Sequence, residues 1–374
     1  MVPAYHSQVT SSRQTPLYQV HERLGAVMTS FAGWQMPLRY GSETAEHQAV
    51  RHAAGLFDLS HMGEIRVSGP GAGAALDYAL TGLLSGLRPG RARYTMICAP
   101  DGGVLDDLVV YRQGEQEFLV IANAANTSVV FDELRSRSSG FDATVTDATD
   151  DYALVAIQGP AAAGILGPLA GLDLDALKYY AGEFGDVAGR PAWVARTGYT
   201  GEDGFEVFSR PADAVAIWDA LATAGASAGL VPAGLAARDT LRLEAGMPLY
   251  GNELGPDLTP FEAGLGRVVK FDKPGDFVGR SALSARSLAG PRRELVGLTL
   301  QSRRVARHGF AVFAHPKEAG TVTSGAPSPT LGHPIAMAYL AAGTDAHDAV
   351  LTVGIRGESV PAQLTELPFY SRSR

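Results

Sequence analysis

Short connections between strand-like segments constrain the fold of this chain more than any other feature of its sequence. Two apolar segments, 94–98 and 104–112, flank Pro100-Asp101-Gly102-Gly103, a composition typical of a tight turn. A third strand-like segment, 118–123, follows a short loop, so the three predict an antiparallel meander, and a helix is expected over 127–137. Because parallel strands need longer crossover connections, we predict an α+β fold and not a doubly wound parallel sheet.

The pattern changes towards the C-terminus. Strand-like and helical segments alternate again between residues 153 and 224, with a strand expected at 153–158. From Glu294 on, short strands separated by glycine and proline dominate, which predicts a small all-β domain of barrel or jelly-roll type. We expect residues 284–291 to form the linker that precedes it. A chain of 374 residues is too long for one ordinary domain, so two or three domains are expected.

Composition and charge argue against several classes of function. Hydrophobic residues make up 46% of the chain and charged residues 19%, which is typical of a soluble globular protein with a sizeable core. The formal net charge of -8 argues against a large nucleic-acid interface, which needs a basic surface. No apolar run reaches the roughly 20 residues of a membrane span. We therefore expect neither nucleic acid nor a membrane as a partner.

The single cysteine, Cys98, excludes a disulfide within the chain and favours a reducing compartment. No group of cysteines and histidines has zinc spacing, so no metal is expected. Residues 1–14 are polar, which indicates a flexible lead-in and not a secretory signal. We expect the cytoplasm of a bacterium. A mitochondrial matrix is less favoured, because Arg13 is the only arginine in the lead-in.

Two adjacent carboxylates lie on an otherwise apolar strand. Side chains alternate across a strand, so Asp107 shares a face with Leu105 and Val109, whereas Asp106 shares the opposite face with Leu108. A buried carboxylate without a partner is costly, so it is either paired or kept for chemistry. The competing interpretation is a turn aspartate that accepts hydrogen bonds from nearby backbone amides.

A glycine-rich loop, 197–206, joins two strand-like segments. Its three glycines let the backbone turn tightly and approach a ligand. Tyr199 offers a ring and a hydroxyl, and Glu206 shares its strand face with Phe208. A hairpin with a polar tip explains the same residues equally well.

The helix that Gly234 opens carries a charged face. Arg238 and Arg242 lie on one side, and Asp239 can pair with Arg242 three residues on. Taken alone, this pattern indicates a solvated, salt-bridged surface. The alternative is an arginine that binds a carboxylate.

The segment Gly69-Pro-Gly-Ala-Gly-Ala74 fits a dinucleotide-binding pattern. Such a fingerprint needs an acidic residue about 20 positions further on, and 87–91 contains none. We therefore interpret it as a Gly-Pro start of a helix and not as a nucleotide site.

Taken in order, these and other segments resemble one family. They are 31–37 (Phe-Ala-Gly-Trp-Gln-Met-Pro), 57–63 (Phe-Asp-Leu-Ser-His-Met-Gly), 103–108 (Gly-Val-Leu-Asp-Asp-Leu), 123–126 (Asn-Ala-Ala-Asn), 158–160 (Gln-Gly-Pro), 197–206, 234–244, 249–251, 260–262 and 323–329. Each is modest alone, but together they resemble the aminomethyltransferase (T-protein) family of the glycine cleavage system. The resemblance covers nearly the whole chain after Thr15.

The resemblance implies a three-domain cloverleaf around a central folate channel. The expected domains are 15–55 with 145–275, 56–144, and 285–374. It also implies a reaction in which an aminomethyl group on the dihydrolipoyl arm of a carrier protein (H-protein) loses ammonia. Its one-carbon unit passes to tetrahydrofolate, the co-substrate, and gives 5,10-methylenetetrahydrofolate.

The resemblance also implies roles for individual residues. Asp107 matches the aspartate that touches the folate nitrogens receiving the carbon, and Arg238 matches an arginine near the reacting centre. The remaining residues match groups that bind the pterin edge or line the pocket: Glu206, Asn123, Tyr94, Tyr199 and Met62. We expect Trp34 and His61 to be structural. Arg267 stands where relatives often carry a tryptophan, and partner fit could differ if that position lines the path of the lipoyl arm.

Two alternatives remain open at this point. One is a folate-dependent demethylase of a small methylated substrate on the same scaffold. The other is a non-catalytic folate-binding protein that assists iron–sulfur assembly. Cys98 lies in Met-Ile-Cys-Ala-Pro, which does not match the Lys-Gly-Cys-x-x-Gly-Gln stretch of those proteins.

Overall fold

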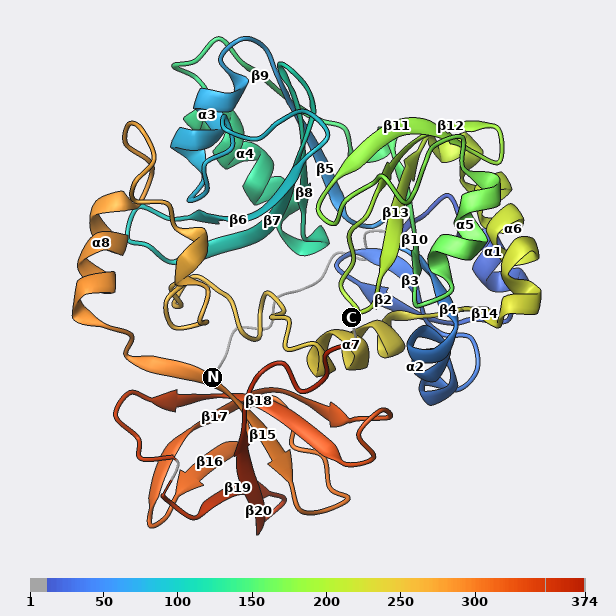
Figure 1. The fold of residues 1–374 in the computed structure, drawn as a ribbon. Helices are drawn as coiled ribbons and strands as arrows, with labels where there is room; N and C mark the ends of the chain where they lie inside the picture. Colours follow the sequence, from blue (N-terminus) through green and yellow to red (C-terminus); the bar gives the residue numbers. More distant parts are fainter. Residues whose placement is uncertain (1–11, 347, 373–374) are drawn as a thin grey trace.

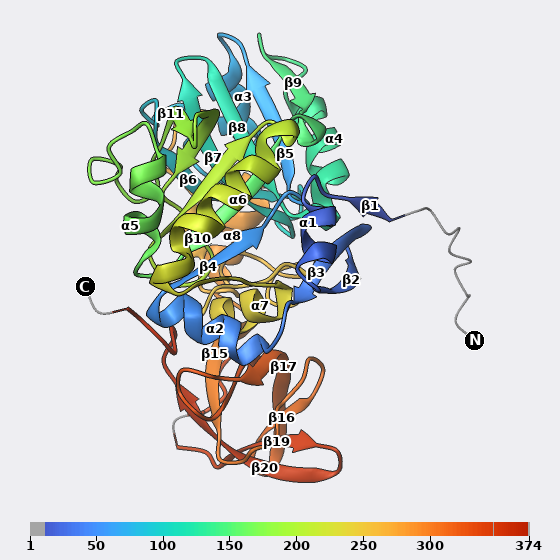
Figure 2. The ribbon, with the colours of Figure 1, turned by 90° about the vertical axis from the view of Figure 1, so that its right-hand side faces the viewer.

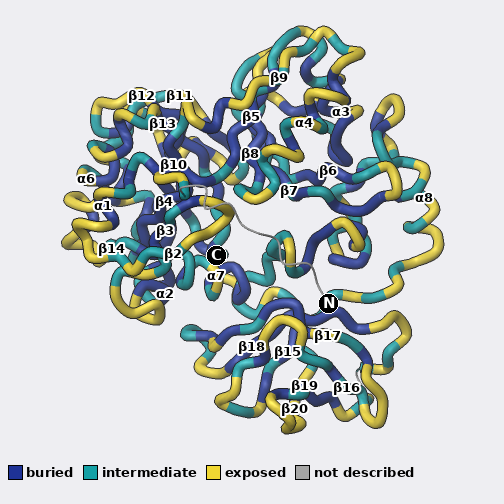
Figure 3. Tube along the Cα trace, turned by 180° about the vertical axis from the view of Figure 1, so that it is seen from behind, coloured by how far each residue is buried: buried dark blue, intermediate teal, exposed yellow. Residues whose placement is uncertain are grey.

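Residues 12–346 and 348–372 are described by a computed structural model, which has three lobes around a central region (Figure 1). Two lobes are built on sheets of six and five strands, and the third is a closed barrel of six strands. Figure 3 shows that the buried residues run along the strands of these sheets. The fold is therefore α+β with a C-terminal barrel, as the sequence predicts.

The six-stranded sheet forms the first lobe. Its strands, in spatial order, are β11 (Gly182–Val187), β12 (Arg190–Ala195), β13 (Gly204–Ser209), β10 (Ala153–Gln158), β4 (Ala54–Asp58) and β14 (Leu230–Pro232). Helices α1 (Tyr18–Arg23), α5 (Ala162–Leu166) and α6 (Ala214–Gly225) pack on one face, where Ile165, Ile217 and Trp218 enter the core. The opposite face packs against the second sheet.

The five-stranded sheet forms the second lobe. Its order is β6 (Ala92–Cys98), β7 (Val104–Gly114), β8 (Glu117–Ala122), β5 (Gly63–Ser68) and β9 (Thr144–Asp147), so the predicted meander is confirmed. Helices α3 (Ala72–Ala79) and α4 (Thr127–Arg137) pack on its outer face. Helix α3 ends at Ala79. Lys273 donates to the carbonyls of Asp77, Leu80 and Gly82, and so satisfies the end of the helix.

The barrel closes through β15 (Arg293–Leu300), β18 (Pro334–Ala341), β17 (Lys317–Pro327), β16 (Ala311–Ala314), β19 (Leu351–Ile355) and β20 (Glu358–Thr365). The segment expected as the linker, 284–291, is mostly helical, because α8 (Arg280–Ala289) covers residues 284–289 before the barrel begins. Residues 280–289 include alanine, leucine and arginine and contain no glycine or proline, which favours a helix.

The remaining elements lie between the lobes. A small sheet is formed by β1 (Arg13–Gln14), β3 (Trp34–Arg39) and β2 (Val27–Phe31). Arg13 and Gln14 are thus part of a strand and not of the flexible lead-in predicted for them, because they pair with Trp34 and Gln35. The rest of that prediction, residues 1–11, lies outside the described residues. Figure 2 shows α2 (Glu43–His52) and α7 (Leu235–Glu244) between β4 and the barrel.

The inner faces of the two large sheets pack against each other. One shared core cluster holds Phe57 and Phe208 from the first sheet together with Tyr111 and Ile121 from the second. Leu241 of α7 closes the same cluster. Side chains at the edge of this contact face the space between the lobes, and the candidate site lies there.

A buried carboxylate without a hydrogen-bond partner marks the same contact. Glu64 on β5 is 1% exposed, and neither of its carboxylate oxygens has a partner among the described residues. Burial raises the pKa of Glu64 well above its ordinary value, and the charges of Asp147 and Asp150 add to this. The folded state therefore favours the protonated acid.

Glu64→Gln is expected to stabilise the fold increasingly as the pH rises. A carboxyl whose folded pKa is raised contributes stability at low pH that is lost as the pH rises through that pKa, and glutamine removes this loss. We expect a gain of about 2–4 °C in Tm at pH 8 and little difference at pH 5. Thermal unfolding at both pH values measures this, and an equal shift at both would contradict it.

Candidate active site

A cavity of about 330 Å³ opens where the two large sheets meet. All seven residues to which the resemblance assigns a role line it, and each is half-buried. They are Met62, Tyr94, Asp107, Asn123, Tyr199, Glu206 and Arg238. They come from both sheets, from the loop before β13 and from α7, and only the packing of these elements brings them together.

Asp107 and Asp106 point to opposite sides of β7, as the alternation of a strand predicts. Asp107 lines the cavity, whereas Asp106 is 0% exposed and does not line it. Tyr94 donates its hydroxyl hydrogen to Asp107 over 3.0 Å. Burial raises the pKa of Asp107, although hydrogen bonds from Tyr94 and Asn123 oppose this. The pKa of Asp106 is raised to about 7, by burial and by the neighbouring charge of Asp107.

Asn123 links the two carboxylates. Its side-chain nitrogen donates to Asp106 Oδ1 and to Asp107 Oδ1, both over 2.9 Å. Asp106 also accepts from the backbone nitrogen of Asn123 over 2.9 Å and from the side-chain nitrogen of Asn126 over 2.6 Å. Both hydrogens of the Asn123 amide are therefore used, which leaves its carbonyl oxygen as the group it can offer to a ligand.

Glu206 lies across the cavity on β13. One oxygen of its carboxylate accepts from Thr197 Oγ1 over 2.6 Å and from the Tyr111 hydroxyl over 3.1 Å. Its neighbours Phe205 and Val207 point into the core beneath the sheet. The carboxylate is held in place by two hydroxyls, and no described arginine or lysine forms an ion pair with it. It can accept further hydrogen bonds from a donor-rich ligand.

Arg238 and Tyr199 form the wall opposite the sheets. The guanidinium of Arg238 lies 4.8 Å from the centre of the Tyr199 ring, a cation–π contact, and Tyr199 donates its hydroxyl to the carbonyl of Pro248. Among the described residues, no carboxylate lies within ion-pair distance of Arg238. Burial lowers the pKa of Arg238, although arginine stays charged at neutral pH.

The other charged residues of α7 are placed differently. Arg242 is 1% exposed and pairs with Asp239 over 2.8 Å and with Glu253 over 3.0 Å. Arg242 also donates to Ser324 of the barrel. The predicted pairing of Arg242 with Asp239 is confirmed. The prediction that Arg242 lies on a solvated surface is wrong, because partners from distant segments bury it.

A second cavity of about 590 Å³ adjoins the first. The two share Met62, Asn123, Tyr199, Arg238 and Tyr250, so these residues form the boundary between two compartments. The second compartment is also lined by Phe31, His61 and Arg307. Sequence reasoning treats His61 as structural and so misses it as a cavity residue. Arg267 is exposed on a short helical turn (Gly266–Val268) and lines neither compartment.

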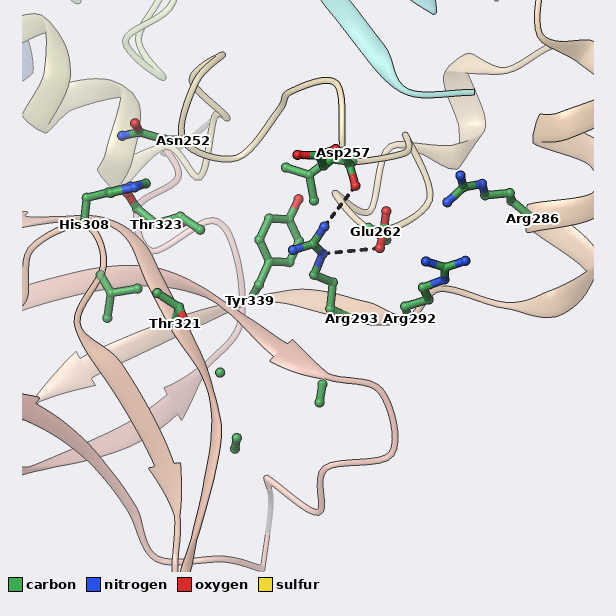
Figure 4. Close-up of a pocket in the computed structure, with 15 residues that line it drawn as sticks. Asn252, Asp257, Glu262, Arg286, Arg292, Arg293, His308, Thr321, Thr323 and Tyr339 are labelled. Atoms are coloured by element: carbon green, nitrogen blue, oxygen red, sulfur yellow. Dashed lines mark hydrogen bonds and ion pairs between the residues drawn. The ribbon is translucent and has the colours of Figure 1, made fainter. Parts of the chain in front are cut away.

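Another cavity, of about 660 Å³, lies elsewhere, between the barrel, α8 and the loop around Asp257 (Figure 4). Arg293 there binds Glu262 over 3.3 Å and the carbonyl of Asp257 over 2.9 Å. None of the predicted site residues lines it. Volume alone therefore does not identify the reacting centre.

The described residues contain no candidate metal site and no candidate membrane-spanning helix. Residues 12–346 and 348–372 hold no group of three histidine, cysteine or acidic side chains placed to bind a metal ion. No helix in the same part of the chain is long and apolar enough to cross a membrane. Cys98 is buried, and burial raises the pKa of its thiol to about 12, which makes it a poor nucleophile at neutral pH.

Two family models match this chain, one before the barrel and one over the barrel. Residues 17–273 match the family model described as the GCVT N-terminal domain, and residues 293–371 match the glycine cleavage T-protein C-terminal barrel domain. An aminomethyltransferase of Saccharopolyspora erythraea is 62% identical over 98% of this chain and all of its own length. One from Moorella thermoacetica is 49% identical over 97% of this chain and 99% of its own length. The crystal structure of a glycine cleavage system aminomethyltransferase T from Bartonella henselae is 38% identical, with a TM-score of 0.89 over 96% of this chain and 98% of that one.

Proposed function

This chain belongs to the glycine cleavage T-protein family of aminomethyltransferases, and we propose the reaction that it catalyses. The substrate is an aminomethyl group on the dihydrolipoyl arm of a carrier protein, the H-protein. The one-carbon unit passes to tetrahydrofolate, ammonia is released, and 5,10-methylenetetrahydrofolate forms. Because the relatives compared above are bacterial, we place this activity in the cytoplasm of a bacterium.

The observation that carries this proposal is the pair of carboxylates in one cavity. Asp107 and Glu206 both line the first compartment, on different sheets. A reduced pterin carries hydrogen-bond donors along one edge, and a carboxylate can accept two of them at once. Glu206 would bind this edge, and Asp107 would then face the nitrogens that receive the carbon.

The reaction needs a group that manages protons near these nitrogens. Tetrahydrofolate gives up the hydrogens of N5 and N10 when the methylene bridge forms. One of them ends in ammonia and the other in the thiol of the carrier arm. A carboxylate such as Asp107 can accept a proton and can stabilise a cationic iminium nearby, and positioned proton transfer is worth about 10²–10⁴-fold in rate.

The second compartment suits the carrier arm. It meets the first compartment at Arg238 and Asn123, so an arm that enters it reaches the folate from the other side. A thiolate leaving the one-carbon unit at this boundary would be stabilised by the Arg238 guanidinium, which has no described carboxylate partner. The two substrates would then occupy separate compartments and meet at the boundary.

The direct test is to mix the protein with tetrahydrofolate and an aminomethylated lipoyl carrier and to measure ammonia. Release of ammonia that depends on both substrates is the expected result. Turnover of a methylated nitrogen or sulfur compound without ammonia release would instead indicate a demethylase. Folate binding without turnover of either substrate would indicate a binding protein.

Glu206→Gln is expected to weaken tetrahydrofolate binding by about tenfold or more. The change removes the charge that strengthens the hydrogen bonds to the pterin, and such bonds contribute about 1.5–3 kcal/mol. Titration calorimetry measures the Kd. Glu183→Gln on the exposed edge strand β11 is the matched control and should leave the Kd unaltered. If both variants bind alike, Glu206 does not contact the folate.

A further inference from the structure

The C-terminal segment, residues 366–372, leaves the barrel after β20 and reaches the wall of the first compartment. In Figure 1 it rises from the barrel towards α7. Leu367 and Phe369 pack against α7 and the barrel. Pro368 lies so close to Gly246 that a Cβ built on this glycine would be 3.1 Å from Pro368 Cα. Gly246 lines the first compartment, to which the described barrel strands contribute no residue. The C-terminal segment therefore connects the barrel to this compartment.

Tyr370 joins the C-terminal segment to α2 and α7. Its backbone nitrogen donates to the carbonyl of Glu244, the last residue of α7, over 2.8 Å. The guanidinium of Arg51 on α2 lies 4.0 Å from the centre of the Tyr370 ring, a cation–π contact. Only 1% of the Arg51 side chain is exposed. The aromatic ring thus covers one side of a guanidinium that is closed to water.

Arg51 ties together two segments that flank the first compartment. It donates to the carbonyl of Thr200 over 2.7 Å and to Glu202 Oε1 over 2.8 Å, and both partners belong to the glycine-rich loop. It also donates to Glu244 Oε2 over 2.9 Å. One guanidinium therefore fixes the position of the glycine-rich loop relative to α7.

The contact between Tyr199 and Arg238 depends on the same spacing. Tyr199 precedes Thr200 in the loop, and Arg238 lies on α7. The Arg238 guanidinium and the Tyr199 ring are 4.8 Å apart, and both residues line both compartments. A shift of the loop relative to the helix would move this wall, and small displacements of a binding wall weaken productive binding.

We infer that Tyr370 is a positioning residue for the first compartment: its ring shields the Arg51 guanidinium from water and so keeps the glycine-rich loop locked to α7. Excluding water strengthens ion pairs and hydrogen bonds, because the effective dielectric constant around them is lower. Without the ring, water would compete for Arg51 with the carbonyl of Thr200 and with Glu202. The inference rests on the proposed function only for the ligand of the compartment.

Hydrogen exchange tests the positioning without any ligand. Tyr370→Ala should speed exchange of the amides of 197–206 by about fivefold or more, because a loop with a weakened anchor opens more often. Exchange in the barrel strand β18 should stay within about twofold of the wild type, since the barrel keeps its own core. Tyr370→Phe keeps the ring over Arg51 and should exchange as the wild type does.

Titration calorimetry then links this position to the ligand. Tyr370→Ala should raise the Kd for tetrahydrofolate about three- to tenfold, and Tyr370→Phe should raise it less than about twofold. The ratio of the Tyr370→Ala Kd to the wild-type Kd should increase with salt, because salt screens an ion pair that water can reach far more than a buried one. Tyr78→Ala, which removes a partly exposed tyrosine from α3, is the control and should leave loop exchange and Kd unaltered.

The other outcomes would each be distinct. Unaltered exchange in the glycine-rich loop of Tyr370→Ala would overturn the inference. If Tyr370→Phe exchanged as fast as Tyr370→Ala, the hydroxyl and not the ring would matter, and the shielding of Arg51 would be refuted. A fall in Tm with loop exchange and Kd unaltered would make Tyr370 only structural. A wild-type protein that binds no tetrahydrofolate would refute the proposed function, whereas the exchange measurement would still decide the role of Tyr370.

Discussion

Asp107→Asn is expected to lower the turnover of ammonia release by about 10²–10⁴-fold, while the Kd for tetrahydrofolate changes by less than about threefold. Asparagine keeps the shape of the side chain and can still bond to Tyr94 and Asn123. It removes the charge and the ability to accept a proton. A loss in kcat without a loss of binding is the signature of an interaction used in the transition state.

The pH dependence gives a second measure of the same role. Burial raises the pKa of Asp107, and the carboxylate form is the one that accepts a proton. Activity should therefore rise with pH through this raised pKa, and Asp107→Asn should abolish that limb of the profile. An unaltered limb would assign it to another group, such as Asp106.

Asp106→Asn is the matched control, because the two residues are neighbours on opposite faces of β7. Asp106 lines neither compartment and holds the side chain of Asn123. We expect a loss of turnover well below that of Asp107→Asn. Equal losses would mean that the faces are assigned wrongly or that the orientation of Asn123 matters as much as the charge of Asp107.

Local elements could be predicted from the sequence wherever their signals are local. The strand at 153–158 and the helix at 127–137 occur at the predicted bounds, because apolar patterning and turn residues act over a few positions. The alternation on β7 and β13 also gave the correct faces for Asp107 and Glu206. The sequence pattern does not predict that these two faces pack against each other, since the contact joins strands about 100 residues apart.

Features that depend on distant partners could not be predicted from the sequence. Arg242 looks like a surface residue of an amphipathic helix, and only Glu253 and Ser324 bury it. His61 looks like a core histidine, and its unbonded nitrogen appears only when every neighbour is placed. The grouping of the seven site residues came from resemblance to a family and not from patterning.

A buried ionic network joins the first lobe, α7 and the barrel. Glu244 at the end of α7 is 0% exposed and accepts from Arg51 Nη2 over 2.9 Å and from His47 Nε2 over 3.1 Å. Ser328 and Thr330 of the barrel donate to the same carboxylate. Burial alone would raise the pKa of Glu244, but the hydrogen bonds and charge of its partners lower it to about 2.

Glu244→Ala is expected to destabilise the protein by about 3–5 kcal/mol, because it leaves the buried charge of Arg51 with Glu202 as its remaining carboxylate partner. A carboxyl with a lowered folded pKa contributes stability that is present above its unfolded pKa and is lost as the pH falls towards 2. The difference between wild type and variant should therefore be full at pH 7 and clearly smaller at pH 3.

Thermal unfolding at both pH values measures this effect, and the loss at pH 7 corresponds to a fall of roughly 10 °C in Tm. Glu358→Ala removes the exposed barrel pair with Arg304, in which both side chains are about half exposed, and should cost less than about 1 kcal/mol. If the two variants lose similar stability, or if the loss from Glu244→Ala is the same at pH 3 and pH 7, the network does not act through the charge of Glu244. Helix α7 also carries Arg238, which lies at the boundary between the two compartments. If the network positions this helix, Glu244→Ala should also lower the rate of ammonia release at temperatures where the variant is still folded.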